Sequence, residues 1–286
     1  MKLRRNSYEI KKQVCIGLSS IMLLTTVTPV LAETISPTEN NSITNVNLIN
    51  VKSEQIDYAS IVERLDLDEL NFFIQEEKIN NPNISEEKLE EKLKLKVLQE
   101  GIDNNIIFIG NDDSVTFNND TNTFSYGDLP IIQNRLGPNE KKVFNKSLLK
   151  GLSVLTAAQV AMDSYKKYYN SSSGYEDDNA DAFRHALWMC ISAFEAGDSF
   201  AREFGIAHED DYSGTTLARE MDLFNNNVGI SKSSQIFGNT PTEDVPFYAS
   251  IIINDAVKNG ELRRFKGMDI SDKTYLVRIN SSGSRK

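Results

Sequence analysis

The sequence predicts a mainly α-helical protein, in which a C-terminal bundle of about six helices follows a small region of helices and a β-hairpin. Three observations lead to this fold class. Apolar residues recur at helical spacing over most of residues 137–260. Polar and Gly-containing stretches separate these helical segments. The β-prone runs are short and are confined to residues 105–126 and 261–279.

The N-terminus has the pattern of a secretory signal peptide over residues 1–32. Basic residues that begin with Lys2 precede an apolar run over 14–30, and Val30-Leu31-Ala32 places small residues before a cleavage point. We therefore expect a secreted, extracellular protein that is cleaved after Ala32. The alternative is an uncleaved N-terminal anchor, because the apolar run approaches the length of a membrane span.

Residues 33–56 are polar and rich in Asn, Thr and Ser, which predicts a disordered leader. Residues 57–130 are expected to form the N-terminal region. Its helices are predicted over 61–79 and 85–98. The short β-prone runs at 106–109, 114–117 and 123–126 predict a hairpin or a small meander.

Residues 137–260 are expected to form the helical core domain, and 261–286 a short β-prone tail. Pro130 and Pro138 place the boundary before this domain near 128–137. The predicted core helices cover 138–150, 152–169, 179–195, 198–208, 216–229 and 245–259.

Charge and cysteine content narrow the class of protein. The 286 residues carry a net charge of −10, and removing residues 1–32, with five basic residues and one acidic residue, brings it to −14. This acidity argues against nucleic-acid coating. No later segment is long and apolar enough to span a membrane, so we expect no stable membrane insertion after the signal is removed. Because Cys15 leaves with the signal, Cys190 remains alone in an apolar string, which predicts a buried, inert thiol.

The helix expected over 179–195 carries one polar stripe on an otherwise apolar surface. Asp181, Arg184 and His185 lie on this stripe together with Trp188. Asp181 and His185 are four residues apart and can touch, so the carboxylate can orient the imidazole. A stripe that faces solvent usually carries Lys and Glu, whereas this mixture is more typical of the lining of a cleft.

Two further strings carry candidate chemistry. Ala207-His208-Glu209-Asp210-Asp211 joins four groups that could bind a metal or transfer a proton. In the stretch 219–229, Asp222, Asn225 and Asn226 lie on one helix face. Structural alternatives exist for both strings, because His favours helix C-termini and Asn often lies near a terminal Gly.

The residues permit three interpretations. A divalent metal such as zinc could be held by His185, His208 and Asp222, with Asp181 and Glu209 as further ligands. In a metal-free alternative, His185 is the base, His208 or Glu209 is the acid, and Arg184 with Asn225 and Asn226 stabilises an anion. In the third, these polar groups form a buried network that only locks the helices in register. The candidate catalytic residues are Asp181, Arg184, His185, His208, Glu209, Asp222, Asn225 and Asn226.

Three strings in order, DAFRHALW from Asp181, AHE from Ala207 and EMDLFNN from Glu220, resemble the signatures of a poorly characterised bacterial domain family. Its members are secreted proteins and C-terminal modules of large secreted or toxin-like polypeptides. The resemblance covers about residues 137–260 and implies no settled activity. Many relatives have His where this chain has Phe224, which argues against a site with three His ligands here.

Several classes of protein are excluded because the sequence lacks their motifs. These are hydrolases with a G-x-S-x-G motif, P-loop and Rossmann proteins, and EF-hand proteins. Two hypotheses remain. The first is a secreted hydrolase-like enzyme acting on a lipid, nucleotide or cell-wall substrate. The second is a non-catalytic secreted helical binding or interaction protein, in which the polar cluster is structural and the N-terminal helices and hairpin meet the partner.

Overall fold

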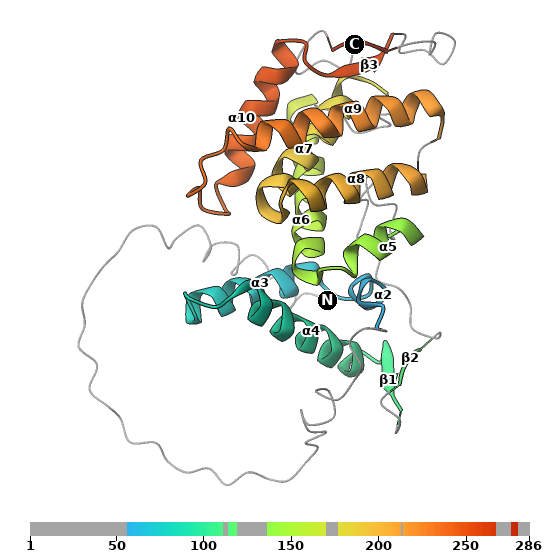
Figure 1. The fold of residues 1–286 in the computed structure, drawn as a ribbon, viewed down its shortest axis with the longest axis vertical. Coiled ribbons are helices and arrows are strands. Elements are labelled where there is room, and N and C mark those ends of the chain that lie inside the picture. The colour runs from blue at the N-terminus through green and yellow to red at the C-terminus, as the bar shows by residue number, and fades with distance from the viewer. Residues whose placement is uncertain are drawn as a thin grey trace, which may run out of the picture. The chain divides into compact units, whose positions relative to one another are not determined.

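The computed structural model describes residues 56–110, 114–118, 136–169, 177–212, 214–266 and 276–279. These ranges lie within one compact unit of the chain, residues 45–286. They contain nine α-helices and two small antiparallel sheets of two strands each (Figure 1). The predicted fold class, mainly α with a small β-hairpin, is confirmed. The predicted signal peptide and all of the predicted leader except Ile56, which is buried, lie outside the described residues.

The N-terminal helices are α2 (Tyr58–Val62), α3 (Leu67–Asn80) and α4 (Glu86–Asp103). The helix predicted over 61–79 is therefore two helices, because the Asp66 carboxylate accepts from the Asp68 N–H and starts α3 afresh. Ser85 caps α4 through the Lys88 N–H. The predicted hairpin is confirmed, with β1 (Ile107–Ile109) paired antiparallel to β2 (Val115–Phe117). The β-prone run at 123–126 lies outside the described residues.

The core segment forms six helices, as predicted, although several boundaries differ. They are α5 (Pro138–Phe144), α6 (Leu148–Tyr169), α7 (Asn179–Ala196), α8 (Asp198–Tyr212), α9 (Thr216–Ser233) and α10 (Val245–Lys258). The start of α6 precedes the predicted residue 152 because the Glu90 carboxylate, on α4, accepts from the N–H groups of Leu148 and Leu149, each at 2.8 Å. The C-terminal strands β3 (Arg263–Phe265) and β4 (Leu276–Arg278) pair antiparallel.

Helix α7 is the centre of the bundle, since it contacts α6, α8, α9, α10 and β3. Almost all of its side chains are buried. The crossing of α7 and α9 is very close: a Cβ atom placed on Gly229 would lie 2.1 Å from the backbone oxygen of Ala186. Glycine at 229 therefore allows the two motif-bearing helices to meet.

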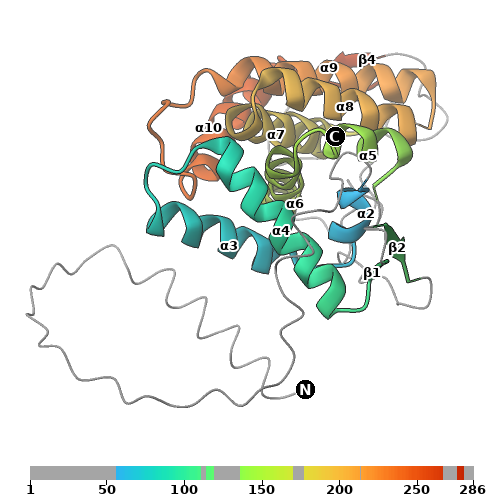
Figure 2. The ribbon, with the colours of Figure 1, turned by 60° about the horizontal axis from the view of Figure 1, so that its bottom comes forward.

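The helices surround α6 on two sides. In Figures 1 and 2, α8 and α9 run side by side on one side of α6, and α3 and α4 lie on the other. Within the described ranges, no helix combines the length and the apolar character that crossing a membrane requires.

Candidate functional site

The candidate site begins at the N-terminal end of α7, which its own sequence fixes. The Asp178 carboxylate caps the helix by accepting from the N–H groups of Ala180 (2.8 Å) and Asp181 (3.0 Å). About two turns beyond Asp181, the Trp188 indole N–H donates to the backbone oxygen of Val154 on α6 (3.0 Å). These contacts hold the polar stripe of α7 in place inside the bundle.

His185 is the hub of the buried cluster and is only 4% exposed. Its Nε2 atom lies 3.3 Å from Asp181 Oδ1 and 3.5 Å from Asp222 Oδ1. Asp222 comes from α9, so the stripe predicted on α7 and the EMDLFNN string meet at this imidazole. The structure therefore brings together two of the three motifs through direct contacts of one ring.

Arg184 lies beside the same carboxylate. Its Nη2 atom is 2.5 Å from Asp181 Oδ1 and 3.4 Å from His185 Nε2. The other oxygen of Asp181 accepts from the Asp177 N–H at 2.7 Å. Asp181 is thus held by a guanidinium, an imidazole and a backbone amide, which fixes its position as an orienting group.

Glu209 of α8 completes the cluster on the other side of the imidazole. Its Oε1 atom lies 3.8 Å from His185 Nδ1 and 3.4 Å from the Asn226 amide nitrogen, which donates to it. His185 Nδ1 is buried and has no hydrogen-bond partner within the described part of the chain. This ring nitrogen is therefore available for a further proton transfer or hydrogen bond.

The second histidine has a different carboxylate partner. His208 Nδ1 lies 2.8 Å from Glu140 Oε1, and Glu140 is completely buried at the start of α5. The other Glu140 oxygen accepts from the Gly137 N–H at 2.7 Å. Glu140 is not among the predicted site residues, because no local pattern indicates its contact with a residue 68 positions away.

The two imidazoles nevertheless lie close together. Their ring centroids are 6.3 Å apart, and the His208 ring also meets Trp188 edge-on at 5.0 Å. Trp188 lies on the same stripe of α7 as His185. The AHE string on α8 therefore joins the other two motifs around one pair of histidines, although each histidine keeps its own carboxylate.

The remaining predicted site residue has a structural contact. The Asn225 amide donates to the backbone oxygen of Arg263 and accepts from the Arg263 N–H, both at 2.9 Å, so it attaches β3 to α9. The Phe224 side chain lies 37% exposed under the Arg263 guanidinium, with 4.6 Å to the ring centroid. Position 224 thus faces away from the buried histidines.

Burial and charge shift the proton affinities within the cluster. Burial lowers the pKa of His185, but the charges of Asp222 and Asp181 outweigh it and raise the pKa to about 9. Burial also raises the pKa of Asp222 well above its ordinary value, and neighbouring carboxylates add to this rise. For Asp181, Arg184 and His185 overcome the effect of burial and lower the pKa. At neutral pH the His185–Asp222 pair therefore holds a proton next to an ionised Asp181.

One group of described residues has the donor spacing for a metal ion. Asp181, His185 and Asp222 each offer a ligand atom, and these atoms lie within 4.8 Å of one another. His208, which the sequence predicts as a ligand, is not in this group, and its Nδ1 atom lies 2.8 Å from Glu140 Oε1. However, the Arg184 guanidinium already lies on the Asp181 oxygen and beside His185 Nε2, and a metal ion would have to displace it. The geometry thus favours a site whose resident cation is Arg184.

A small hollow of about 130 Å³ adjoins the cluster on the α8–α9 side. Asn226 is part of its lining, together with Met189, Leu223 and Ile230. Asn226 Oδ1 is buried and lacks a hydrogen-bond partner among the described residues. Asn226 therefore links the hollow to Glu209 and, through it, to His185.

Comparison with known protein families identifies one segment of the chain. Residues 141–261 match one family model. Its description is a domain of unknown function (DUF6973). All eight predicted site residues lie inside the DUF6973 segment, and Glu140 lies one residue before it. The expected resemblance is thereby confirmed as that of an uncharacterised domain. No curated protein and no solved structure matches the chain.

Proposed function

We propose that this chain is a hydrolase-like enzyme whose acid–base centre consists of His185 and His208. One observation carries the proposal: two imidazoles from different helices lie with their ring centroids 6.3 Å apart, and each faces a buried carboxylate of its own. Paired histidines with separate orienting carboxylates can hold one proton and accept another, as hydrolysis by general acid–base catalysis requires.

His185 is the general acid in this proposal, which reverses the role of base expected from the sequence. Its raised pKa, about 9, keeps it protonated at neutral pH. Asp181 and Asp222 face Nε2, so Nδ1, which has no hydrogen-bond partner among the described residues, carries the proton that is transferred to the leaving group. Asp181 and Asp222 act as positioning residues.

His208 is the general base. When Nδ1–H donates to Glu140, the lone pair remains on Nε2, which can take a proton from an attacking water molecule. The water oxygen then bonds to the substrate as the leaving group departs with the proton from His185. Glu140 is the positioning residue that fixes this tautomer.

The test measures hydrolysis by the purified protein of three nitrophenyl substrates: a butyrate ester, a phosphodiester and an N-acetylglucosaminide. We expect turnover of one bond type, with kcat at least about 100-fold lower in His185→Gln and in His208→Gln. Glu140→Gln should shift the pH dependence of kcat. Asp210→Asn, which removes a neighbouring carboxylate at the surface, should leave this pH dependence unchanged. The proposal fails if no bond type shows turnover that depends on both histidines.

A second candidate function is supported by the burial of the cluster. His185 is 4% exposed and His208 7% exposed, so both could serve only to lock α7, α8 and α9 together in a binding protein. In that case the two His→Gln variants lower the melting temperature by several degrees and no hydrolysis is found. If the proposed enzyme is correct, both variants lose turnover and His208→Gln melts close to the wild type, whereas His185→Gln also loses the stability that the charge of His185 supplies.

We also propose that the protein is exported. The support is the sequence of residues 1–32, whose basic start, apolar run and Val30-Leu31-Ala32 ending fit a cleaved signal. Mass spectrometry of the protein recovered from culture medium should find Glu33 as the first residue. An intact N-terminus in the cell fraction would contradict export.

A further inference from the structure

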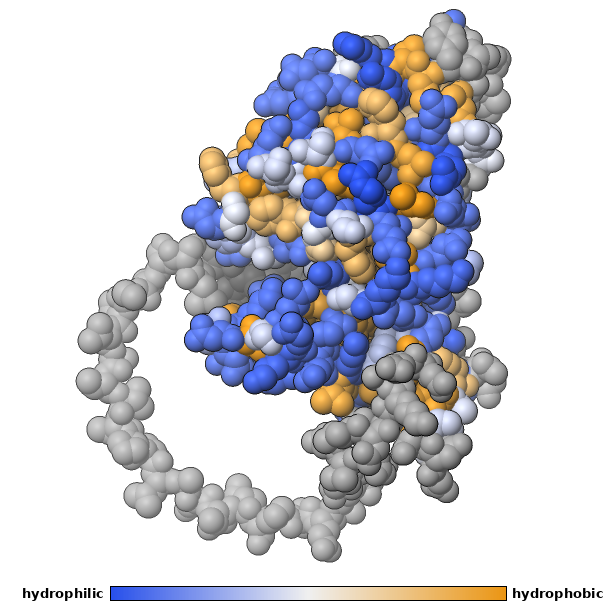
Figure 3. All heavy atoms as spheres, viewed as in Figure 1, coloured by the Kyte–Doolittle hydropathy of each residue, from blue (hydrophilic) through white to orange (hydrophobic). Residues whose placement is uncertain are grey.

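A second and larger hollow lies away from the histidines. It has a volume of about 800 Å³ and opens between the N-terminal helices α3 and α4 and the DUF6973 helices α6 and α7. Figure 3 shows the molecule indented between the hydrophilic surface of α3–α4 and the helices above it. A hollow of this volume is in the range that holds a small organic ligand.

Four charged side chains line the hollow, and they divide into two kinds. Lys150 and Glu86 pair with each other across the rim at 3.3 Å. Lys78 and Glu195 remain. Lys78 makes no ion pair with any described residue, and Glu195 Oε1 is buried without a hydrogen-bond partner in the described part of the chain. One cation and one carboxylate of this hollow are therefore left for a ligand.

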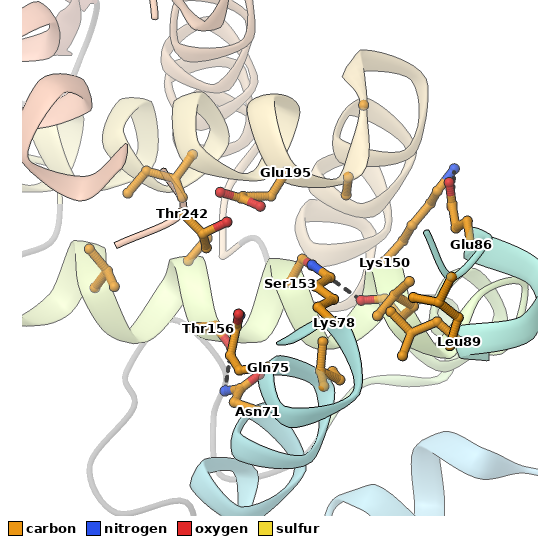
Figure 4. A pocket seen from close by; sticks show the side chains of 18 of the residues that line it. Asn71, Gln75, Lys78, Glu86, Leu89, Lys150, Ser153, Thr156, Glu195 and Thr242 are labelled. Atoms are coloured by element: carbon orange, nitrogen blue, oxygen red, sulfur yellow. Dashed lines mark hydrogen bonds and ion pairs between the residues drawn. The ribbon is translucent and has the colours of Figure 1, made fainter. Parts of the chain in front are cut away.

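These two groups enter the hollow from different elements. In the close view of Figure 4, Lys78 extends from α3 and Glu195 from the C-terminal end of α7, on the other side of the hollow. Burial raises the pKa of Glu195, and the positive charge of Lys78 opposes this rise. A buried carboxyl oxygen without a partner is costly, and a donor carried by a ligand would relieve that cost.

The rest of the lining is mixed. Ile74, Leu89, Val160 and Ile191 supply aliphatic surface. Two of the lining hydroxyls already have partners, since Ser153 donates to the backbone oxygen of Leu149 and Thr156 accepts from the Asn71 amide. Gln75 and Thr242 are further polar groups of the lining, whereas Lys78 and Glu195 supply its charges without an ion pair, and the aliphatic surface suits an apolar side chain.

We propose that this hollow binds a short zwitterionic peptide with aliphatic side chains, with its ammonium at Glu195 and its carboxylate at Lys78. The two unpaired charges of opposite sign match the two ends of such a peptide, and its side chains lie against the isoleucine, leucine and valine surface. The site is built from both the N-terminal helices and the DUF6973 segment. It does not depend on the histidine pair.

The experiment is a calorimetric titration of the full protein with the dipeptide Leu-Leu and two blocked forms. N-acetyl-Leu-Leu lacks the ammonium, and Leu-Leu amide lacks the carboxylate. We expect the free dipeptide to bind at least tenfold more tightly than either blocked form, because each block leaves one protein charge unpaired. The proposal is overturned if Leu-Leu does not bind at millimolar concentration, or if the blocked forms bind equally well.

Two variants then test which protein charge binds which end of the dipeptide. Glu195→Gln should abolish the preference for the free ammonium, and Lys78→Met the preference for the free carboxylate. Asp255→Asn and Lys258→Met, which alter an exposed ion pair at the far end of α10, serve as matched controls and should bind as the wild type does. A preference that survives both Glu195→Gln and Lys78→Met would also overturn the proposal.

Discussion

Asp210 and Asp211 are neighbours at the end of α8, yet their carboxylates have different partners. Asp211 accepts from the N–H groups of Asn139 (2.9 Å) and Glu140 (3.0 Å) and so caps α5 from another helix. Asp210 pairs with Arg219 at the surface, where both side chains are well exposed. His208 also contacts Glu140 at the start of α5, and Glu209 lies beside His185, so these four successive residues contact three different helices, α5, α7 and α9.

This difference predicts unequal effects of the same substitution. Asp211→Ala removes the cap of α5 and should lower the free energy of unfolding by about 1–2 kcal/mol. Asp210→Ala breaks an exposed ion pair and should cost less than about 1 kcal/mol. Urea unfolding of both variants measures the difference. Equal losses would show that Asp211 does not cap α5 in solution.

At the scale of elements, the contact of α7 with α9 decides whether the site can form. Asp222 reaches His185 only because the two helices cross closely, and Gly229 is the residue that permits this approach. The backbone, rather than a flexible side chain, would meet any added methyl group. Such a clash can be relieved only by moving the helices apart.

We therefore expect Gly229→Ala to destabilise the fold by about 3 kcal/mol or more and to separate Asp222 from His185. Gly238→Ala is the matched control, because a Cβ atom there meets nothing within 4 Å, and its effect should stay within about 0.5 kcal/mol. Thermal melting of the two variants is the measurement. A Gly229→Ala protein as stable as the wild type would contradict the close packing of α7 on α9.

At the scale of the whole molecule, periodicity predicted much of what the structure contains. The buried character of α7, the hairpin β1–β2 and the helical content follow from local patterns that a sequence displays directly. The meeting of Asp181, His185 and Asp222 was predictable as a possibility, since each motif placed its polar groups on one helix face.

The partners of these residues could not be predicted in the same way. The contact of Glu140 with His208, the attachment of β3 by Asn225 and the hollow between α3 and α6 all join segments that are distant in sequence. Tertiary packing decides such contacts, and no local pattern encodes them. For this reason the run 207–211, which reads as one cluster, is divided in the fold.

The stability of the whole molecule should also depend on the charge of His185. The pKa of this group is raised from 6.5 to about 9 on folding, so its contribution is fully present below pH 6.5 and is lost as the pH rises through 9. Between pH 6 and pH 9.5, the free energy of unfolding should fall by roughly 2–3 kcal/mol more in the wild type than in His185→Gln. Identical pH profiles would contradict a proton held by the cluster.

The most direct test of the acid–base centre is an NMR titration of the histidine rings in protein without a histidine tag. The chain has only two histidines, so a His208→Gln variant assigns both signals. We predict that His185 titrates near pH 9, as a general acid beside Asp181 and Asp222 requires. A midpoint for His185 at or below 6.5 would contradict the proposed centre.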